Sequence, residues 1–183
     1  MEEELGDKSD AAETRLALAE LDCDSGKGAE AEQLSHAAVE AFRADGYTDE
    51  ESLAQSMLSR ALLQQGKLAA ARSAIADAVR LSQKRQDVLV RIPVILDHVY
   101  VMAAANNLGG AESTAQDVLT QTRNLGLFRW QVEASLALGE IQMQKKNHDM
   151  GRKRLAETEK TARSKGFELI AQKAGAAKQA IVR

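Results

Sequence analysis

Histidine and cysteine are the residue types that most often bind metals or act as nucleophiles, and this chain of 183 residues has three histidines and one cysteine. His36, His98 and His148 stand far apart in the sequence, and no cluster of cysteine or carboxylate at ligand spacing accompanies them. The pattern therefore predicts no metal site. Cys23 lies between two aspartates, whose negative charge disfavours the reactive thiolate. Together these residues predict a protein that is not an enzyme and uses no cofactor.

Two further patterns raise the question of phosphate or nucleic-acid binding. Gly109 and Gly110 lack the lysine and serine that flank the glycines of a phosphate-binding loop. Residues 145–183 carry 11 Lys and Arg against 4 Asp and Glu, but Glu157 and Glu159 interrupt the basic run at helical spacing from bases. No aromatic residue is interleaved for base stacking. The run therefore indicates a solvated helix face, and we expect no nucleic-acid partner.

The charges are divided unevenly along the chain. Residues 1–51 hold 16 acids and 4 bases, residues 52–144 hold 7 and 9, and the remainder is basic. If the elements follow one another in space, the two ends of the molecule have opposite charge. We then expect weak head-to-tail self-association that salt screens out. The alternative is that the acidic end faces a domain of a longer protein.

The composition predicts that helices must position any functional residues. Aromatic residues make up 3% of the chain and there is one proline, while alanine, leucine and charged residues with high helix propensity dominate. The longest apolar stretch, Val99 to Ala105, is far shorter than the roughly 20 residues of a membrane span. The N-terminus lacks the pattern of a signal peptide. We expect an all-α, soluble, cytoplasmic protein without a membrane partner.

The helices are predicted to form hairpins that repeat at a constant sequence offset of 40. The turn segments GKGAEAE (26–32), GKLAAAR (66–72), NNLGGAE (106–112) and KNHDMGR (146–152) share this offset. A small residue recurs within them, as Ala31, Ala71, Ala111 and Gly151. The predicted organisation is a disordered lead-in (1–9), four hairpins (10–47, 48–87, 88–127 and 128–167) and a capping helix (168–183).

Two local features bear on where the helices begin. Thr48 and Glu51 have the spacing of a capping box, which predicts a helix start with Thr48 as its cap. Pro93 allows two readings. Either its helix starts late, with the proline in the first turn, or the helix starts near Asp87 and bends at the proline.

The first helix of three hairpins carries a leucine followed by a small residue, at Leu18–Ala19, Leu58–Ser59 and Leu138–Gly139. With the small residue of each turn segment, this pattern resembles the tetratricopeptide repeat. The period exceeds the ~34 residues usual in that family and approaches that of HEAT and armadillo repeats, but HEAT units normally carry a proline in each first helix. The resemblance implies a right-handed α-solenoid with lengthened helices. The chain is also similar to the regulatory regions of large bacterial signalling proteins, including serine/threonine kinases and transcriptional activators.

The resemblance further implies that the first helices line a concave groove for a partner. The inward positions would be Glu13, Leu16, Glu20, Ser56, Arg60, Gln64, Leu96, Tyr100, Glu133, Leu136, Glu140 and Met143. Their mixture of acids, one arginine and apolar residues suits a peptide or helix that is both basic and apolar. Some relatives clamp a peptide carboxylate with lysine and asparagine, which are missing from these positions.

The sequence therefore favours a non-catalytic scaffold that binds a protein or peptide as part of a larger bacterial signalling protein. The alternative is a regulatory domain that senses a small molecule and controls an attached kinase or DNA-binding domain. A small-molecule site would need several polar groups converging in an apolar pocket.

Overall fold

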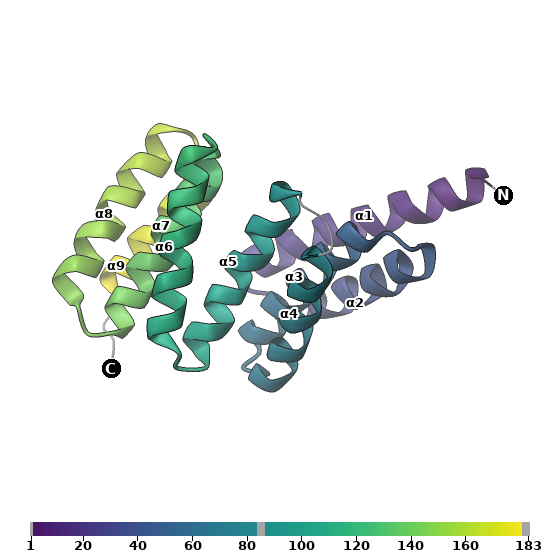
Figure 1. The fold of residues 1–183 in the computed structure, drawn as a ribbon, viewed down its shortest axis with the longest axis horizontal. Helices are drawn as coiled ribbons and strands as arrows, with labels where there is room; N and C mark the ends of the chain where they lie inside the picture. Colours follow the sequence, from purple (N-terminus) through teal and green to yellow (C-terminus); the bar gives the residue numbers. More distant parts are fainter. Residues whose placement is uncertain (1, 84–86, 181–183) are drawn as a thin grey trace. The chain divides into compact units, whose positions relative to one another are not determined.

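The computed structural model describes residues 2–83 and 87–180, with side chains from Asp10 onward (Figure 1). Within these residues the chain is all-α, with no strand, which confirms the all-α part of the predicted fold class. The helices are α1 (Glu2–Asp24), α2 (Gly28–Asp45), α3 (Thr48–Gln64), α4 (Leu68–Ser82), α5 (Val88–Ala104), α6 (Leu108–Asn124), α7 (Phe128–Gln144), α8 (His148–Ser164) and α9 (Glu168–Gln179).

The helices form two compact units, which divide within α5 between Val101 and Met102. In the first unit α1 packs on α2, α2 on α3 and α3 on α4, while α1 also contacts α3. In the second unit the same pattern joins α6 to α7, α7 to α8, α8 to α9, and α7 to α9. Each of these helices thus packs on its neighbour in sequence, and alternate helices also meet.

A residue with left-handed backbone geometry follows most helices. These residues are Gly26, Gly46, Gly66, Asn106, Gly126, Lys146 and Gly166, with φ between 61° and 82°. Their sequence numbers differ by 20 or a multiple of 20, because each helix and its turn use the same length of chain. Glycine suits these positions since it has no Cβ to clash with the backbone. Between positions 66 and 106 the series would include position 86. That residue lies outside the described residues, as do residues 84 and 85 of the predicted 48–87 hairpin.

Helices α3, α5, α7 and α9 begin at the regularly spaced positions 48, 88, 128 and 168. The capping box predicted at Thr48 is wrong. Thr48 is the first helical residue, Tyr47 precedes it, and no side chain caps the helix. The carboxylate of Glu51 instead accepts a hydrogen bond of 2.8 Å from Arg43 of the preceding helix.

Two other helix starts bear on the predicted boundaries. Helix α1 already begins at Glu2, where a disordered lead-in was predicted, and Met1 lies outside the described residues. Helix α5 begins at Val88 and contains Pro93, so the earlier of the two predicted starts is correct.

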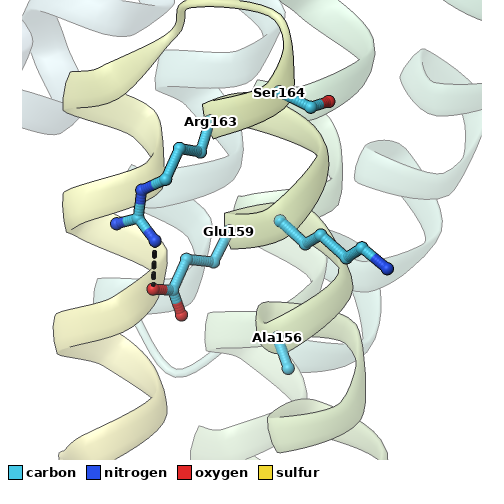
Figure 2. Close-up of a pocket in the computed structure, with 5 residues that line it drawn as sticks. Ala156, Glu159, Arg163 and Ser164 are labelled. Atoms are coloured by element: carbon cyan, nitrogen blue, oxygen red, sulfur yellow. Dashed lines mark hydrogen bonds and ion pairs between the residues drawn. The ribbon is translucent and has the colours of Figure 1, made fainter.

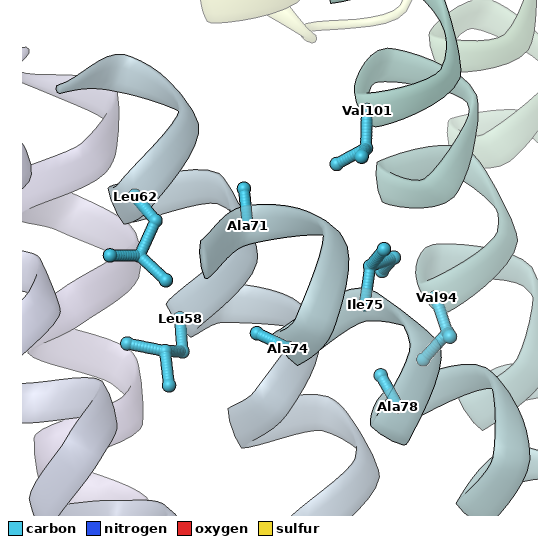
Figure 3. Packing of buried hydrophobic residues seen from close by; sticks show 8 residues of the cluster. All are labelled: Leu58, Leu62, Ala71, Ala74, Ile75, Ala78, Val94 and Val101. Atoms are coloured by element: carbon cyan, nitrogen blue, oxygen red, sulfur yellow. The ribbon is translucent and has the colours of Figure 1, made fainter. Parts of the chain in front are cut away.

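Small residues let the paired helices approach closely. In the first unit Ala71, Ala74 and Ala78 of α4 pack with Leu58 and Leu62 of α3 and with valines of α5 (Figure 3). In the second unit Gly139 lies against Leu155, and a Cβ added to that glycine would stand 2.7 Å from two carbons of the leucine. The leucine–small pairs of the sequence therefore mark close helix contacts.

Candidate functional site

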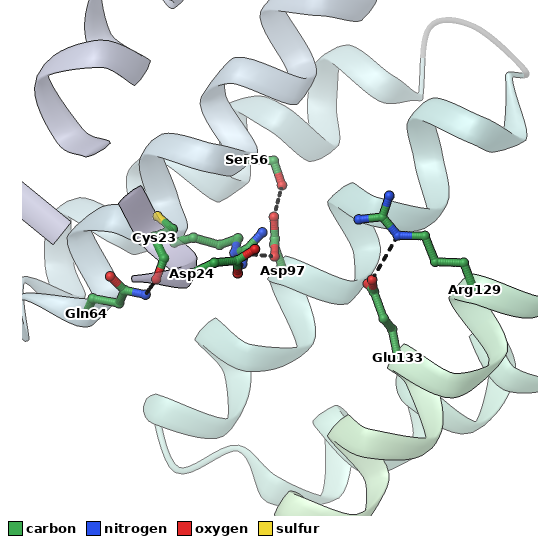
Figure 4. A network of polar contacts seen from close by, with 8 residues as sticks. Cys23, Asp24, Ser56, Gln64, Asp97, Arg129 and Glu133 are labelled. Atoms are coloured by element: carbon green, nitrogen blue, oxygen red, sulfur yellow. Dashed lines mark hydrogen bonds and ion pairs between the residues drawn. The ribbon is translucent and has the colours of Figure 1, made fainter. Parts of the chain in front are cut away.

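A polar network joins the first three alternate helices, α1, α3 and α5, within the first unit (Figure 4). The guanidinium of Arg60, on α3, lies between two carboxylates. Its Nη2 atom is 3.3 Å from Oδ1 of Asp24, on α1, and its Nε atom is 3.6 Å from Oδ1 of Asp97, on α5. All three side chains are partly buried, so the charges are only partly screened by water.

Two further hydrogen bonds fix the network. Ser56 donates from its Oγ atom to Oδ2 of Asp97 at 2.7 Å, and Gln64 donates from Nε2 to the backbone carbonyl of Cys23 at 2.7 Å. The predicted residues Ser56, Arg60 and Gln64 are therefore brought close together on α3. They are tied to the neighbouring helices, however, and hold the first unit together.

The two aspartates of the network were missed from the sequence. Asp97 is the only Asp, Glu, Lys or Arg between Arg91 and Glu112. A lone carboxylate in so apolar a stretch is a signal for a partnered charge, since a buried charge without a partner is costly. Asp24 follows Glu20 by one helical turn, so it shares the face that was assigned to Glu13 and Glu20.

The remaining predicted residues of the first unit differ in how accessible they are. Glu13 is exposed, Glu20 and Tyr100 are half-buried, and Leu16 is half-buried against the core. Leu96 and Ser56 are both buried, so their predicted place in an open groove is corrected. Of the accessible residues, Glu13 and Glu20 are acidic, and Leu16 and Tyr100 are apolar or aromatic.

In the second unit two of the four predicted groove residues are also corrected. Leu136 and Met143 are buried in a cluster with Leu155 of α8 and with Ile170 and other residues of α9. The physical reason is that α9 packs on α7 and covers this side of it. Of the other two, Glu140 is half-buried, and Glu133 accepts a hydrogen bond of 3.1 Å from Arg129.

In each unit an acid at an equivalent position of a second helix forms an ion pair with a lysine just after the next first helix. Lys67 and Gln65 donate to the Glu32 carboxylate, both at 2.7 Å, and the Lys67 bond lowers the pKa of Glu32 below its usual value. Glu112, at the equivalent position two hairpins later, accepts from Lys145 and Gln142, and the Lys145 bond likewise lowers the pKa of Glu112. These pairs clamp α2 to α3 and α6 to α7.

A shallow pocket of about 390 Å³ lies along α8 (Figure 2). Its lining residues are Ala156, Glu159, Lys160, Arg163 and Ser164. All five come from one helix and none is buried. Glu159 already accepts bonds from Arg163 at 3.1 Å and from Lys178 at 2.7 Å, and the Lys178 bond lowers the pKa of Glu159. The pocket lacks the convergent polar groups of a ligand site.

The part of the chain that the structure describes holds no group of three or more His, Cys, Asp or Glu side chains placed to bind a metal. Across residues 2–83 and 87–180, no helix combines the length and apolar character needed to cross a membrane. No protein-family model matches the sequence, and no curated protein matches it significantly. The candidate site therefore has to be judged on its own geometry.

Proposed function

We propose that this protein is a non-catalytic interaction module that binds a basic, amphipathic peptide or helix of a partner protein. It would do so as a right-handed, tetratricopeptide-like solenoid of four hairpins and a capping helix, serving as the regulatory part of a larger bacterial signalling protein. The observation that carries the proposal is the acidic balance around the Arg60 network.

Five charged side chains on the alternate helices of the first unit belong either to the predicted groove positions or to the Arg60 network. Glu13, Glu20, Asp24 and Asp97 supply four carboxylates, and Arg60 supplies the only guanidinium among them, which leaves a formal balance of −3. Arg60 offsets one of the two negative charges of the aspartates at its sides, and Glu13 and Glu20 of α1 add two more, so the face stays acidic. A ligand with lysines or arginines fits this face best.

Half-buried apolar surface accompanies the acids. Leu16 lies between Glu13 and Glu20 on the same helix, and Tyr100 supplies an aromatic side chain on α5. A helix with basic residues on one edge and leucines on the other satisfies both kinds of surface. The alternative of a small-molecule sensor gains no support from the pocket on α8, which one helix lines alone.

The test uses the full chain and a labelled synthetic helix of lysine and leucine with amphipathic spacing. Fluorescence anisotropy would give the dissociation constant at low salt and at about 0.3 M sodium chloride, where the Debye length falls to about 6 Å. We expect saturable binding that weakens with salt. The variant Glu13→Lys/Glu20→Lys should weaken binding about tenfold, since each exposed charge pair contributes roughly 0.2–1 kcal/mol and reversal adds repulsion.

The matched control is Glu30→Lys/Glu40→Lys, which changes the net charge equally at two exposed positions of α2. Equal weakening by both variants would reduce the effect to overall charge and contradict the proposed site. Absence of binding at low salt would overturn the proposed ligand class.

A further inference from the structure

Helix α1 carries a row of exposed small and apolar residues on the side opposite its core contacts. We define this outer face of α1 as Thr14, Ala17, Leu18 and Leu21, all of them exposed. Leu18 is 46% exposed and Leu21 62%, whereas Ala12, Ala19 and Cys23 on the opposite side are buried. Two leucines within one helical turn make this the most apolar part of the helix surface.

The repeat shows what happens to this face elsewhere in the molecule. Leu18 and Leu21 correspond to Leu58 and Ala61 of α3, which are 6% and 0% exposed. In α7 the corresponding residues are Leu138 and Ile141, which are 1% and 2% exposed. The same face is therefore covered on both later helices and open on α1.

Two helices cover this face of α3: α4 packs with Leu58, and α2, the second helix of the preceding hairpin, covers Ala61. Gly28 of α2 lies so close to α3 that an added Cβ would stand 3.0 Å from the carbonyl oxygen of Ala61. Ala31 of α2 packs in one cluster with Met57 and Ala61. Ala38, Val39 and Phe42 of α2 pack in another with Ala54 of α3.

Polar contacts at one end fix the register of this packing. Gln65 donates to the carbonyl of Gly28 at 2.9 Å, and Lys67 donates to Glu32 at 2.7 Å. Lys27 occupies the position in the first hairpin that Lys67 occupies in the second. Its side chain is 59% exposed and lies 3.6 Å from Asp22, so it is accessible to a further carboxylate.

We propose that the outer face of α1 docks an amphipathic helix of a partner protein. That helix presents a seam of glycine, alanine and other small residues to Leu18 and Leu21, and an acidic residue in its first turns to Lys27. We choose this occupant because, at the α2–α3 interface, the equivalent face of α3 packs against a helix that presents Gly28, Ala31 and Ala38. Within the described helices the small-residue seams of a second copy are already covered, because α3 packs on α2, α3 and α5 on α4, α7 on α6 and α9 on α8.

This docking surface is separate from the acidic face of the proposed function. Leu18 and Leu21 point away from the core side of α1, while Glu13 and Glu20 lie on the side that carries Asp24 and faces the Arg60 network. The two proposals can therefore fail independently.

The test probes the isotope-labelled full chain with a synthetic peptide of residues 28–45, which carries the seam and Glu32. Because a single short helix must fold as it binds, we expect weak but saturable shifts of backbone NMR signals, concentrated on the outer face of α1. Leu18→Asp/Leu21→Asp should weaken binding by at least about tenfold, and a peptide with glutamine at positions 31 and 38 should not bind. Leu169→Asp, an equally exposed leucine of α9, is the matched control and should bind normally.

Three results would overturn the proposal. The first is the absence of shifts at about tenfold excess of peptide in the millimolar range. The second is binding that the Leu18→Asp/Leu21→Asp variant retains while circular dichroism shows it folded. The third is sedimentation of the chain as a dimer that this variant abolishes, which would make a second copy the occupant.

Discussion

The contact between Gly139 and Leu155 gives the sharpest test of how the repeat packs. Replacing Gly139 by alanine places a methyl group 2.7 Å from Cγ and Cδ2 of Leu155, which is fully buried and has little room to move. Overpacking of this kind costs about 1–3 kcal/mol. Alanine also gains about 1 kcal/mol over glycine inside a helix. The two effects oppose each other, and we expect a net loss of about 1 kcal/mol, or about 2–4 °C in melting temperature.

The mechanism is isolated by combining this change with Leu155→Ala. That substitution alone should cost about 2–5 kcal/mol, because it opens a cavity in the core of the second unit. In its background Gly139→Ala has room, so only the helix-propensity gain remains and the same change should stabilise by about 1 kcal/mol. The sign of the Gly139→Ala effect therefore reverses between the two backgrounds.

The matched control is Gly109→Ala, at a helical glycine with no heavy atom within 4 Å of an added Cβ. It should stabilise the protein slightly, since only helix propensity changes. Urea unfolding followed by circular dichroism measures all four variants. If Gly139→Ala stabilises the wild-type chain as Gly109→Ala does, or if its effect is the same in both backgrounds, the close contact inferred for Gly139 is wrong.

Four further outcomes are expected from urea unfolding. Ser59→Ala should stabilise by about 1 kcal/mol because the buried Oγ atom has no hydrogen-bond partner, whereas Ser52→Ala should destabilise by about as much because it loses its 2.9 Å bond to the carbonyl of Ala78. Lys146→Gly should stabilise by about 0.5–1 kcal/mol, since its φ of 61° strains any residue with a Cβ. Arg60→Glu should destabilise by about 1–2 kcal/mol, because it adds a third carboxylate to two partly buried aspartates. Burial lowers the pKa of His98, so the fold favours the neutral ring, and the free energy of unfolding should fall as pH drops below about 6.5. The variant His98→Leu, which restores the leucine of the other three hairpins, should not show this loss. The explanation is wrong if the variant and the original chain lose the same stability as pH falls.

The helices were predictable because several local signals agreed. The turn segments recur at a constant offset, and left-handed positions such as Gly26, Gly66 and Gly126 mark where helices must end. Alanine at the small-residue positions then identifies the faces that meet. All of these signals depend on the backbone and on residue size, which act over short sequence distances.

The candidate site was less predictable, because it depends on which side chains of different helices meet. Helical spacing placed Arg60 on the shared face but gave no information on its partners, which come from the first helices of the preceding and following hairpins. It also placed Leu136 and Met143 on that face without showing that α9 covers them. A single first helix has contacts on nearly all sides in this fold, so an apolar residue on the expected groove side is more often core than ligand surface.

The ion pairs at Glu32 and Glu112 had a signal in the sequence that the groove assignment did not use. Both acids follow the small residue of their turn segment by one position, and the other two turn segments carry arginine there, as Arg72 and Arg152. An acid and an arginine therefore alternate at this position from one hairpin to the next. Each acid meets a lysine just after the next first helix, Lys67 or Lys145, where an arginine would be repelled. Exposed pairs of this kind contribute little to stability. We therefore expect the pairs to act on specificity, since an arginine-bearing second helix placed against Lys67 or Lys145 would meet a like charge.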